Sequence, residues 1–164
     1  MMDEREITPN VVFDCNFYLR ATVTRGPAFD CLARLEEQHY TLFVCGPLLE
    51  EVKEVLSRPV LQHRFSALTP ESLAQLLARL EKFAILIHNV PETFRYARDP
   101  DDEVYVNLAL ITNARYLVTY DKDLLDLMRE TEEGRDFRHR FPHLQILGPL
   151  AFLEALDFLR DRAA

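Results

Sequence analysis

Short apolar runs alternate with longer amphipathic stretches along most of the chain. Runs rich in β-branched and aromatic residues that end in a polar residue or a turn predict strands buried on both faces. These runs are residues 11–16, 40–45, 85–90, 115–119 and 144–147. Strands of this kind are typical of parallel sheets, so we expect the sheet to be mostly parallel.

Apolar residues recur at helical spacing between these runs. Helices are predicted over residues 28–37, 48–56, 69–83, 101–112, 122–129 and 152–159. The start at Thr69 is marked by a capping hydroxyl, a proline at the first helical position and an acid in the first turn. The charged segment 130–143 has few apolar residues, and we expect it to be a loop and the one mobile part of the chain.

Alternating strands and helices predict an α/β fold, a three-layer sandwich with a mostly parallel central sheet flanked by helices. A chain of 164 residues suits one domain with a single core. Because no linker or repeat divides the sequence, we expect an N-terminal tail over residues 1–9 and a single domain over residues 10–160.

The composition narrows the class of protein. Hydrophobic residues make up 48% of the chain, which predicts a packed globule rather than disorder. No apolar stretch approaches the ~18–20 residues of a membrane span, and the charged N-terminus lacks the apolar core of a signal peptide. The three cysteines, Cys15, Cys31 and Cys45, cannot all pair with one another. We therefore expect a cytoplasmic protein with reduced thiols and no membrane association.

The net charge of −8 at pH 7 argues against nonspecific binding of duplex nucleic acid, which depends on Lys and Arg. A cluster of carboxylates that holds divalent cations is the setting in which an acidic protein can still act on phosphodiesters. Such a function requires that acids from different parts of the chain lie close together in the fold.

Four carboxylates stand at separate strand-to-helix junctions. Asp14 ends the first apolar run, Glu51 lies in the first turns of the helix after the second run, and Asp102 lies near the start of the helix that Asp99-Pro100 opens. Asp121 follows the fourth run, with Asp123 two residues later. Ligands of open α/β sheets bind outside the carboxyl ends of the strands, so these acids are expected at one edge.

Carboxylates this close together would repel one another and raise one another's pKa values unless a cation lay among them. Hard oxygen ligands suit Mg²⁺ or Mn²⁺. Spacing and charge therefore predict a divalent-metal site.

Several segments of the sequence resemble a known protein family. Five segments carry the resemblance over about residues 10–156: residues 11–16, residues 47–59, Asp99-Pro100-Asp101-Asp102 with Ala109, residues 116–124, and residues 146–153. In this order and spacing they resemble the PIN-domain ribonucleases, and especially the group that forms the toxin component of toxin–antitoxin pairs. The resemblance implies a PIN-like fold and a metal-dependent endoribonuclease that hydrolyses RNA phosphodiester bonds.

The resemblance also implies roles for single residues. The family's catalytic and metal-binding acids fall on Asp14, Glu51, Asp102 and Asp121, with Asp123 as an auxiliary. Asn16 would hold the loop after the first strand or steady a ligand, and Thr119 would be a supporting hydroxyl near the metal. Cys15 departs from the pattern, because the family more often has Thr or Ser there. The implied partners are single-stranded or structured RNA, an antitoxin that blocks the acidic groove by inserting an Arg, and a second copy of the chain.

Several acids have a simpler interpretation. Glu50 and Glu54 neighbour Glu51 on one helix, so the ligand could be displaced by one place. Asp99 is the better helix cap of its cluster, which leaves Asp102 for the metal. We interpret Asp126, Asp157 and Asp161 as ordinary surface charges. Arg58 and Arg64 could contact an RNA phosphate, although solvent-facing charge is the better explanation for both.

Two other functions compete with the nuclease. One is a PIN-like module that binds RNA or a protein partner without cutting, which an intact set of acids disfavours. The other is a phosphotransfer domain, either a response-regulator receiver or a phosphatase with an Asp-x-Asp nucleophile. Asp14-Cys15-Asn16 lacks the second Asp of that motif, and no late Lys follows a strand as in the receivers.

Overall fold

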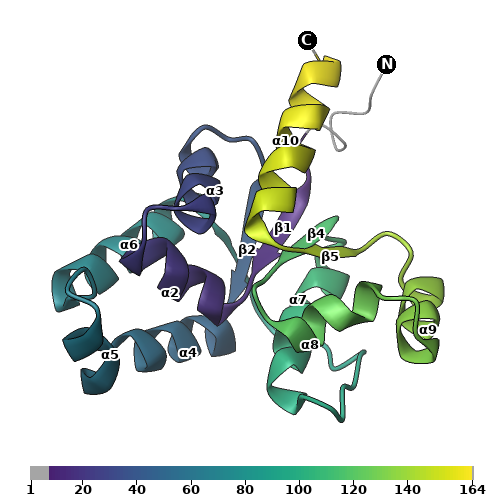
Figure 1. The fold of residues 1–164 in the computed structure, drawn as a ribbon, viewed down its shortest axis with the longest axis horizontal. Coiled ribbons are helices and arrows are strands. Elements are labelled where there is room, and N and C mark those ends of the chain that lie inside the picture. The colour runs from purple at the N-terminus through teal and green to yellow at the C-terminus, as the bar shows by residue number, and fades with distance from the viewer. Residues whose placement is uncertain (1–7, 164) are drawn as a thin grey trace.

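The computed structural model describes residues 8–163, and in these residues strands and helices alternate as the sequence predicts (Figure 1). The strands are β1 (Asn10–Phe13), β2 (Thr41–Cys45), β3 (Ile85–Ile87), β4 (Tyr116–Val118) and β5 (Gln145–Leu147). The α-helices are α2 (Cys15–Val23), α3 (Pro27–Glu36), α4 (Gly46–Leu56), α5 (Pro59–Arg64), α6 (Pro70–Phe83), α7 (Glu103–Ile111), α8 (Lys122–Leu125), α9 (Glu132–Arg140) and α10 (Pro149–Ala163). Two 3-10 turns, η1 (Pro100–Asp102) and η2 (Asp126–Met128), precede α7 and follow α8.

The five strands form one sheet in the order β3-β2-β1-β4-β5, and every neighbouring pair is parallel. The chain builds outward from β1 to β2 and β3, and then returns to the other side of β1 for β4 and β5. The order therefore reverses between β1 and β4, where Val11 pairs with Tyr116 and Phe13 with Val118. In folds of this kind the crevice outside the carboxyl ends of the two strands at the reversal is the usual place for a ligand.

Helices cover both faces of the sheet, which confirms the three-layer sandwich. On one face α7 packs on β1, β2 and β4. On the other, α10 packs on β4 and α3, while α2 packs on α3. The ring of Phe152 in α10 meets those of Phe13 and Tyr116 on the sheet edge-on, with centroids 6.0 and 5.6 Å apart. These rings are almost wholly buried, so they form part of the core between α10 and the sheet.

Local sequence explains where several helices begin. Pro27, Pro47 and Pro70 lie in the first turns of α3, α4 and α6, where the missing N–H costs nothing. Thr69 caps α6 and accepts a hydrogen bond from the amide of Ser72, whose hydroxyl accepts one from the Thr69 amide in return. This reciprocal pair is a capping box, and it confirms the predicted helix start.

The loop predicted over residues 130–143 is wrong. Residues 132–140 form α9, capped by Thr131, whose hydroxyl accepts from the amide of Gly134 at 3.0 Å. Phe137 supplies the anchor, because it is buried against Phe94 and Phe141. One aromatic residue and a cap therefore suffice to hold a helix whose other positions are mostly charged.

Other elements differ in extent from their predictions. The 3-10 turn η1 replaces the first turn predicted for the helix over residues 101–112, and η2 replaces the end of the helix predicted over 122–129. Helix α5 was not predicted, because its six residues carry too short a pattern to show periodicity. Helix α10 is longer than predicted at both ends. The predicted tail over residues 1–9 lies almost entirely outside the described residues.

Within residues 8–163, no helix combines the length and the apolar character that crossing a bilayer requires.

Candidate metal centre

Asp14 and Asp121 lie at the reversal of strand order, each directly beyond the end of its strand. Asp14 follows β1 and caps α2, while Asp121 follows β4 and caps α8. Thr119 joins the two: its buried hydroxyl donates to Asp14 Oδ2 at 2.5 Å and accepts from the backbone amide of Asp121 at 2.8 Å. Thr119 therefore links the ends of the two strands through its hydroxyl.

The Asp14 carboxylate is almost wholly buried, with 3% of the residue exposed. Its Oδ1 accepts a hydrogen bond from the amide of Phe17 at 2.9 Å. The pKa of Asp14 is raised from 3.8 to about 6, mainly by burial; the hydrogen bonds from Thr119 and Phe17 oppose this rise, and the negative charges of Asp121 and Glu51 add to it. The balance shows that the charged carboxylate is held at an energetic cost, which a nearby cation would relieve.

Glu51 approaches from the neighbouring helix α4 and is half-buried. The hydroxyl of Tyr105, a buried residue of α7, donates to Glu51 Oε2. The thiol of Cys15 is buried, and its pKa is raised to about 12, mainly by burial and then by the charges of Glu51 and Asp14. Cys15 is therefore a neutral wall of the site and carries no anionic sulfur to a metal.

Asp102 is buried in η1, with 5% of the residue exposed. Its Oδ2 atom is buried without a hydrogen-bond partner among the described residues. Burial raises the pKa of this carboxyl far above its ordinary value, and the charges of Asp121 and Asp99 add to the rise. A buried carboxylate oxygen with no donor is an unusual and costly arrangement, which a cation ligated there would satisfy.

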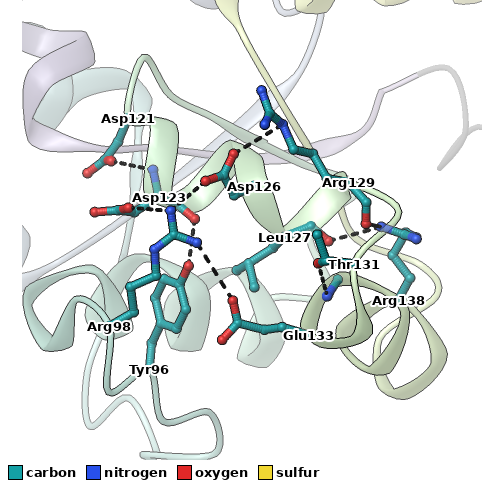
Figure 2. A network of polar contacts seen from close by, with 11 residues as sticks. Tyr96, Arg98, Asp121, Asp123, Asp126, Leu127, Arg129, Thr131, Glu133 and Arg138 are labelled. Carbon is teal, nitrogen blue, oxygen red and sulfur yellow. Dashed lines mark hydrogen bonds and ion pairs between the residues drawn. The ribbon is translucent and has the colours of Figure 1, made fainter.

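Asp99, Asp121 and Asp123 form the tightest acidic group. Each offers a carboxylate oxygen that lies within 4.8 Å of the others, and within residues 8–163 this is the one set of three or more potential ligand residues so close together. Asp121 Oδ1 also accepts from the amide of Asp123 at 2.8 Å, which fixes their relative position (Figure 2). The structure therefore brings Asp121 and Asp123 together with Asp99 and leaves Asp14, Glu51 and Asp102 outside this tight set.

The interpretation of Asp99 as a helix cap is wrong as far as its side chain is concerned. Asp99 does occupy the residue before η1, but its carboxylate makes no capping hydrogen bond. It belongs instead to the acidic group with Asp121 and Asp123. The local pattern cannot distinguish a helix cap from a metal ligand here, because an acid just before a proline suits either role.

Arg98 forms ion pairs with Asp123 of the acidic group and with the neighbouring Asp126. Its guanidinium lies 2.8 Å from Asp123 Oδ1 and 2.5 Å from Asp126 Oδ2, with Glu133 of α9 3.9 Å away (Figure 2). The interpretation of Asp126 as an ordinary surface charge is wrong, because its side chain is only 12% exposed and also lies 3.2 Å from the Arg129 Nε. Arg98 thus ties the segment before η1 to α8, η2 and α9.

The residues present fit a divalent cation. The donors are carboxylate oxygens, hard ligands that Mg²⁺ and Mn²⁺ prefer. The orphaned Asp102 oxygen and the raised pKa values of Asp14 and Asp102 mark a place where positive charge is lacking. A cation bound there would stabilise the charged carboxylates and the fold around them.

Asn16 lies differently from the other predicted residues. It occupies the first turn of α2 and is exposed, and it lines a groove beside Arg20 and Tyr120. Tyr105 and Arg98 were not singled out from the sequence. Tyr105 lies one helical turn after Asp102, which is the only local signal for it, and nothing in the sequence pairs Arg98 with residues 25 and 28 positions away.

Comparison with known proteins identifies the family to which the chain belongs. A family model described as a PIN domain matches residues 10–123, more than half of the chain and a span that holds the acids of the candidate site from Asp14 to Asp123. The match ends before η2, α9, β5 and α10. No curated protein sequence and no solved structure matches the chain significantly.

Proposed function

The chain belongs to the PIN-domain family, whose members are generally metal-dependent nucleases that bind RNA, and from this premise we propose that it is an endoribonuclease. In this proposal it hydrolyses RNA phosphodiester bonds with Mg²⁺ or Mn²⁺ as its cofactor. The observation that supports the proposal best is the tight acidic group of Asp99, Asp121 and Asp123, together with the buried Asp102 oxygen that lacks a donor.

The proposed ligands and catalytic acids are Asp14, Glu51, Asp102 and Asp121, with Asp99 and Asp123 beside them. A divalent ion bound there supplies positive charge to the phosphodiester and lowers the pKa of a water molecule. The chain's own contribution is to orient the carboxylates. Thr119 and the Phe17 amide fix both oxygens of Asp14, and the hydroxyl of Tyr105 fixes Glu51.

Arg98 orients one of the neighbouring carboxylates in this proposal. Because its guanidinium pairs with Asp123 Oδ1, it holds that carboxylate in place and offsets one negative charge at the edge of the site. Arg98 therefore acts as a positioning residue. The acids nearer the strand ends, Asp14 and Asp121, have no arginine or lysine ion pair among the described residues, so their charge is left for a metal.

The test uses a circular single-stranded RNA, because only an endonuclease can open a circle. We expect the purified protein to linearise it with Mn²⁺ or Mg²⁺ and to leave it intact in EDTA. Asp121→Asn should cut at least about 100-fold more slowly, as is typical when a charged group at a reacting centre is lost. Asp157→Asn is the matched control, because Asp157 is an exposed acid of α10 paired with Arg34.

Equal rates for wild type and Asp121→Asn would overturn the proposed mechanism. A single-stranded DNA circle of the same sequence separates a ribonuclease from a nuclease without sugar preference. Binding without cutting of either substrate would favour the alternative, a PIN module that binds RNA or a protein partner without catalysis.

We further propose that the protein is the cytoplasmic toxin of a toxin–antitoxin pair, on the strength of the segments that resemble that group. The matching antitoxin would block the acidic groove, and an inserted Arg suits an excess of carboxylates. Co-expression with the product of the neighbouring open reading frame tests this. We expect growth arrest by the wild-type chain alone, relief by the neighbour, and no arrest by Asp121→Asn. Sedimentation of the pure protein tests the proposed homodimer.

A further inference from the structure

A groove of about 470 Å³ lies between α2 and α5. At one end it is lined by Asn16, two residues after Asp14, and by Tyr120, the residue before Asp121. Leu19 and Leu61 contribute apolar walls from the two helices. Two residues that line the groove are therefore close neighbours of Asp14 and Asp121 in the sequence, although neither acid lines the groove itself.

The charge of this groove is opposite to that of the acidic site. Arg20 of α2 and Arg64 of α5 line it, and neither has a carboxylate partner within the described part of the chain. Arg58, at the other end of the short helix α5, shows the contrast, because its Nε and Nη2 atoms donate to the Glu54 carboxylate at 3.0 and 2.8 Å. In a protein with a net charge of −8, two unpaired arginines in one groove are a local reversal of sign.

Aromatic rings lie beneath both guanidinium groups. The Arg20 guanidinium lies 4.9 Å from the centre of the Tyr120 ring, and that of Arg64 lies 5.1 Å from the centre of the Phe65 ring. Tyr120 is 36% exposed, so part of its ring faces solvent. Aromatic rings interleaved with arginines form the surface on which proteins stack unpaired bases and hold the phosphates between them.

We propose that this groove is a binding subsite for single-stranded RNA, which seats the nucleotides next to the phosphate held at the acidic site. Tyr120 stacks on a base, and Arg20 and Arg64 contact the backbone phosphates. Duplex RNA is excluded, because its bases are already stacked on one another and cannot lie on the ring. The subsite rests on the proposed function, since it assumes that the acids act on RNA.

The proposal explains how an acidic protein can hold a polyanion. The carboxylates repel RNA until a cation neutralises them, so affinity must come from outside the acidic site. The arginines of the groove supply it, in a groove whose lining also includes Asn16, two residues after Asp14, and Tyr120, the residue before Asp121. Helix α5, which carries Arg64, therefore has a function that its short sequence pattern did not reveal.

Binding is tested without cleavage, by fluorescence anisotropy of a labelled single-stranded RNA with the full chain in EDTA. We expect Tyr120→Ala to weaken binding about 5- to 100-fold, the range found when a base loses a stacking partner. Arg20→Gln and Arg64→Gln should each lower the slope of log affinity against log salt by about 0.7. A labelled RNA duplex should bind wild type more weakly than the single strand.

Two controls match these variants. Phe158 and Arg162 of α10 form a similar pair, with the guanidinium 5.4 Å from the ring centre and the ring exposed, and they lie outside the groove. Phe158→Ala and Arg162→Gln should leave both the affinity and the salt slope unchanged. Thermal melting of all variants separates a loss of binding from a loss of folding.

The outcomes distinguish the subsite from the nuclease. If wild type cuts RNA but the groove variants bind it as wild type does, the subsite is overturned and the nuclease stands, and the groove then suits a peptide of a protein partner. If wild type binds RNA through the groove but does not cut, the nuclease fails and the subsite stands. If wild type does not bind single-stranded RNA, the subsite is overturned.

Discussion

Thr119 is the residue on which the geometry of both strand ends depends. Its buried hydroxyl is at once the donor to Asp14 and the acceptor for the Asp121 amide, so one side chain sets the distance between two acids that are more than a hundred residues apart. We expect Thr119→Val, which keeps the shape and removes the hydroxyl, to destabilise the protein by about 1–3 kcal/mol and to slow cleavage.

Urea unfolding and the circular-RNA assay check the Thr119 prediction together. Thr119→Ser keeps the hydroxyl and should recover most of the activity, although it loses a methyl group from the core. A Thr119→Val protein that cuts at the wild-type rate would show that the bridge has no part in positioning the acids.

Asp14 makes the metal-free protein sensitive to pH. Its pKa rises from 3.8 in the unfolded chain to about 6 in the fold, so the folded state binds this proton more tightly. The stabilising contribution is complete below about pH 4 and is lost as the pH rises through 6, a change of about 3 kcal/mol. Asp14→Asn abolishes this titration, so in EDTA we expect it to melt at a higher temperature than wild type at pH 8.

Calorimetry in EDTA at pH 4 and pH 8 measures the Asp14 effect. The two proteins should differ much less at pH 4, where Asp14 is protonated, and Asp157→Asn should behave as wild type at both values. An Asp14→Asn protein that melts below wild type at pH 8 would contradict the electrostatic account of this residue.

At the scale of elements, α9 depends on a close backbone approach. A Cβ atom at Gly134 would lie 2.3 Å from the carbonyl oxygen of Arg129, which itself accepts a hydrogen bond from Arg138 at 2.8 Å. Ala is the better helix former, but here it must push the backbone apart. We therefore expect Gly134→Ala to destabilise the protein by about 1–3 kcal/mol.

Gly46 offers the matched control for α9. It also lies in a helix, at the start of α4, but nothing stands within 4 Å of the position where its Cβ would be. Gly46→Ala should leave the free energy of unfolding unchanged or raise it slightly. Chemical denaturation of the two variants compares them directly, and equal effects would show that the contact at Gly134 is not limiting.

The whole molecule is expected to be stabilised by a divalent ion. An ion that binds only the folded state stabilises it by about 2.7 kcal/mol at a concentration 100 times its dissociation constant. Adding Mn²⁺ should therefore raise the melting temperature of wild type, more at pH 7.5 than at pH 5, because Asp14, whose pKa is raised to about 6, binds a proton at the lower pH. EDTA should reverse the shift.

A thermal-shift titration with Mn²⁺ follows this stabilisation. Asp121→Asn should reduce or abolish the shift, since Asp121 lies in the tight acidic group, whereas Asp157→Asn should keep it. An equal shift in all three proteins would place the bound ion elsewhere on the molecule.

The periodic elements and the strand-end acids could be predicted because they depend on local patterns. The strand ending at Asp14 and the helix beginning after Thr69 were recognisable from a few neighbouring residues. Helix α9 and the role of Asp99 could not be predicted in this way, for two different reasons. The pattern of α9 is too polar to show the one buried face at Phe137, and the position of Asp99 before a proline suits a cap as well as a ligand.

The sequence by itself determined the order of elements, the parallel sheet and the placing of acids at strand-to-helix junctions, because each follows from the character of adjacent residues. Only the tertiary structure decided which acids share a space. It brought Asp99 to Asp121, set Arg98 against Asp123, and left an oxygen of Asp102 without a donor. These contacts join residues far apart in the chain, so their distances depend on how the helices pack across the reversal of the sheet, which no local pattern encodes.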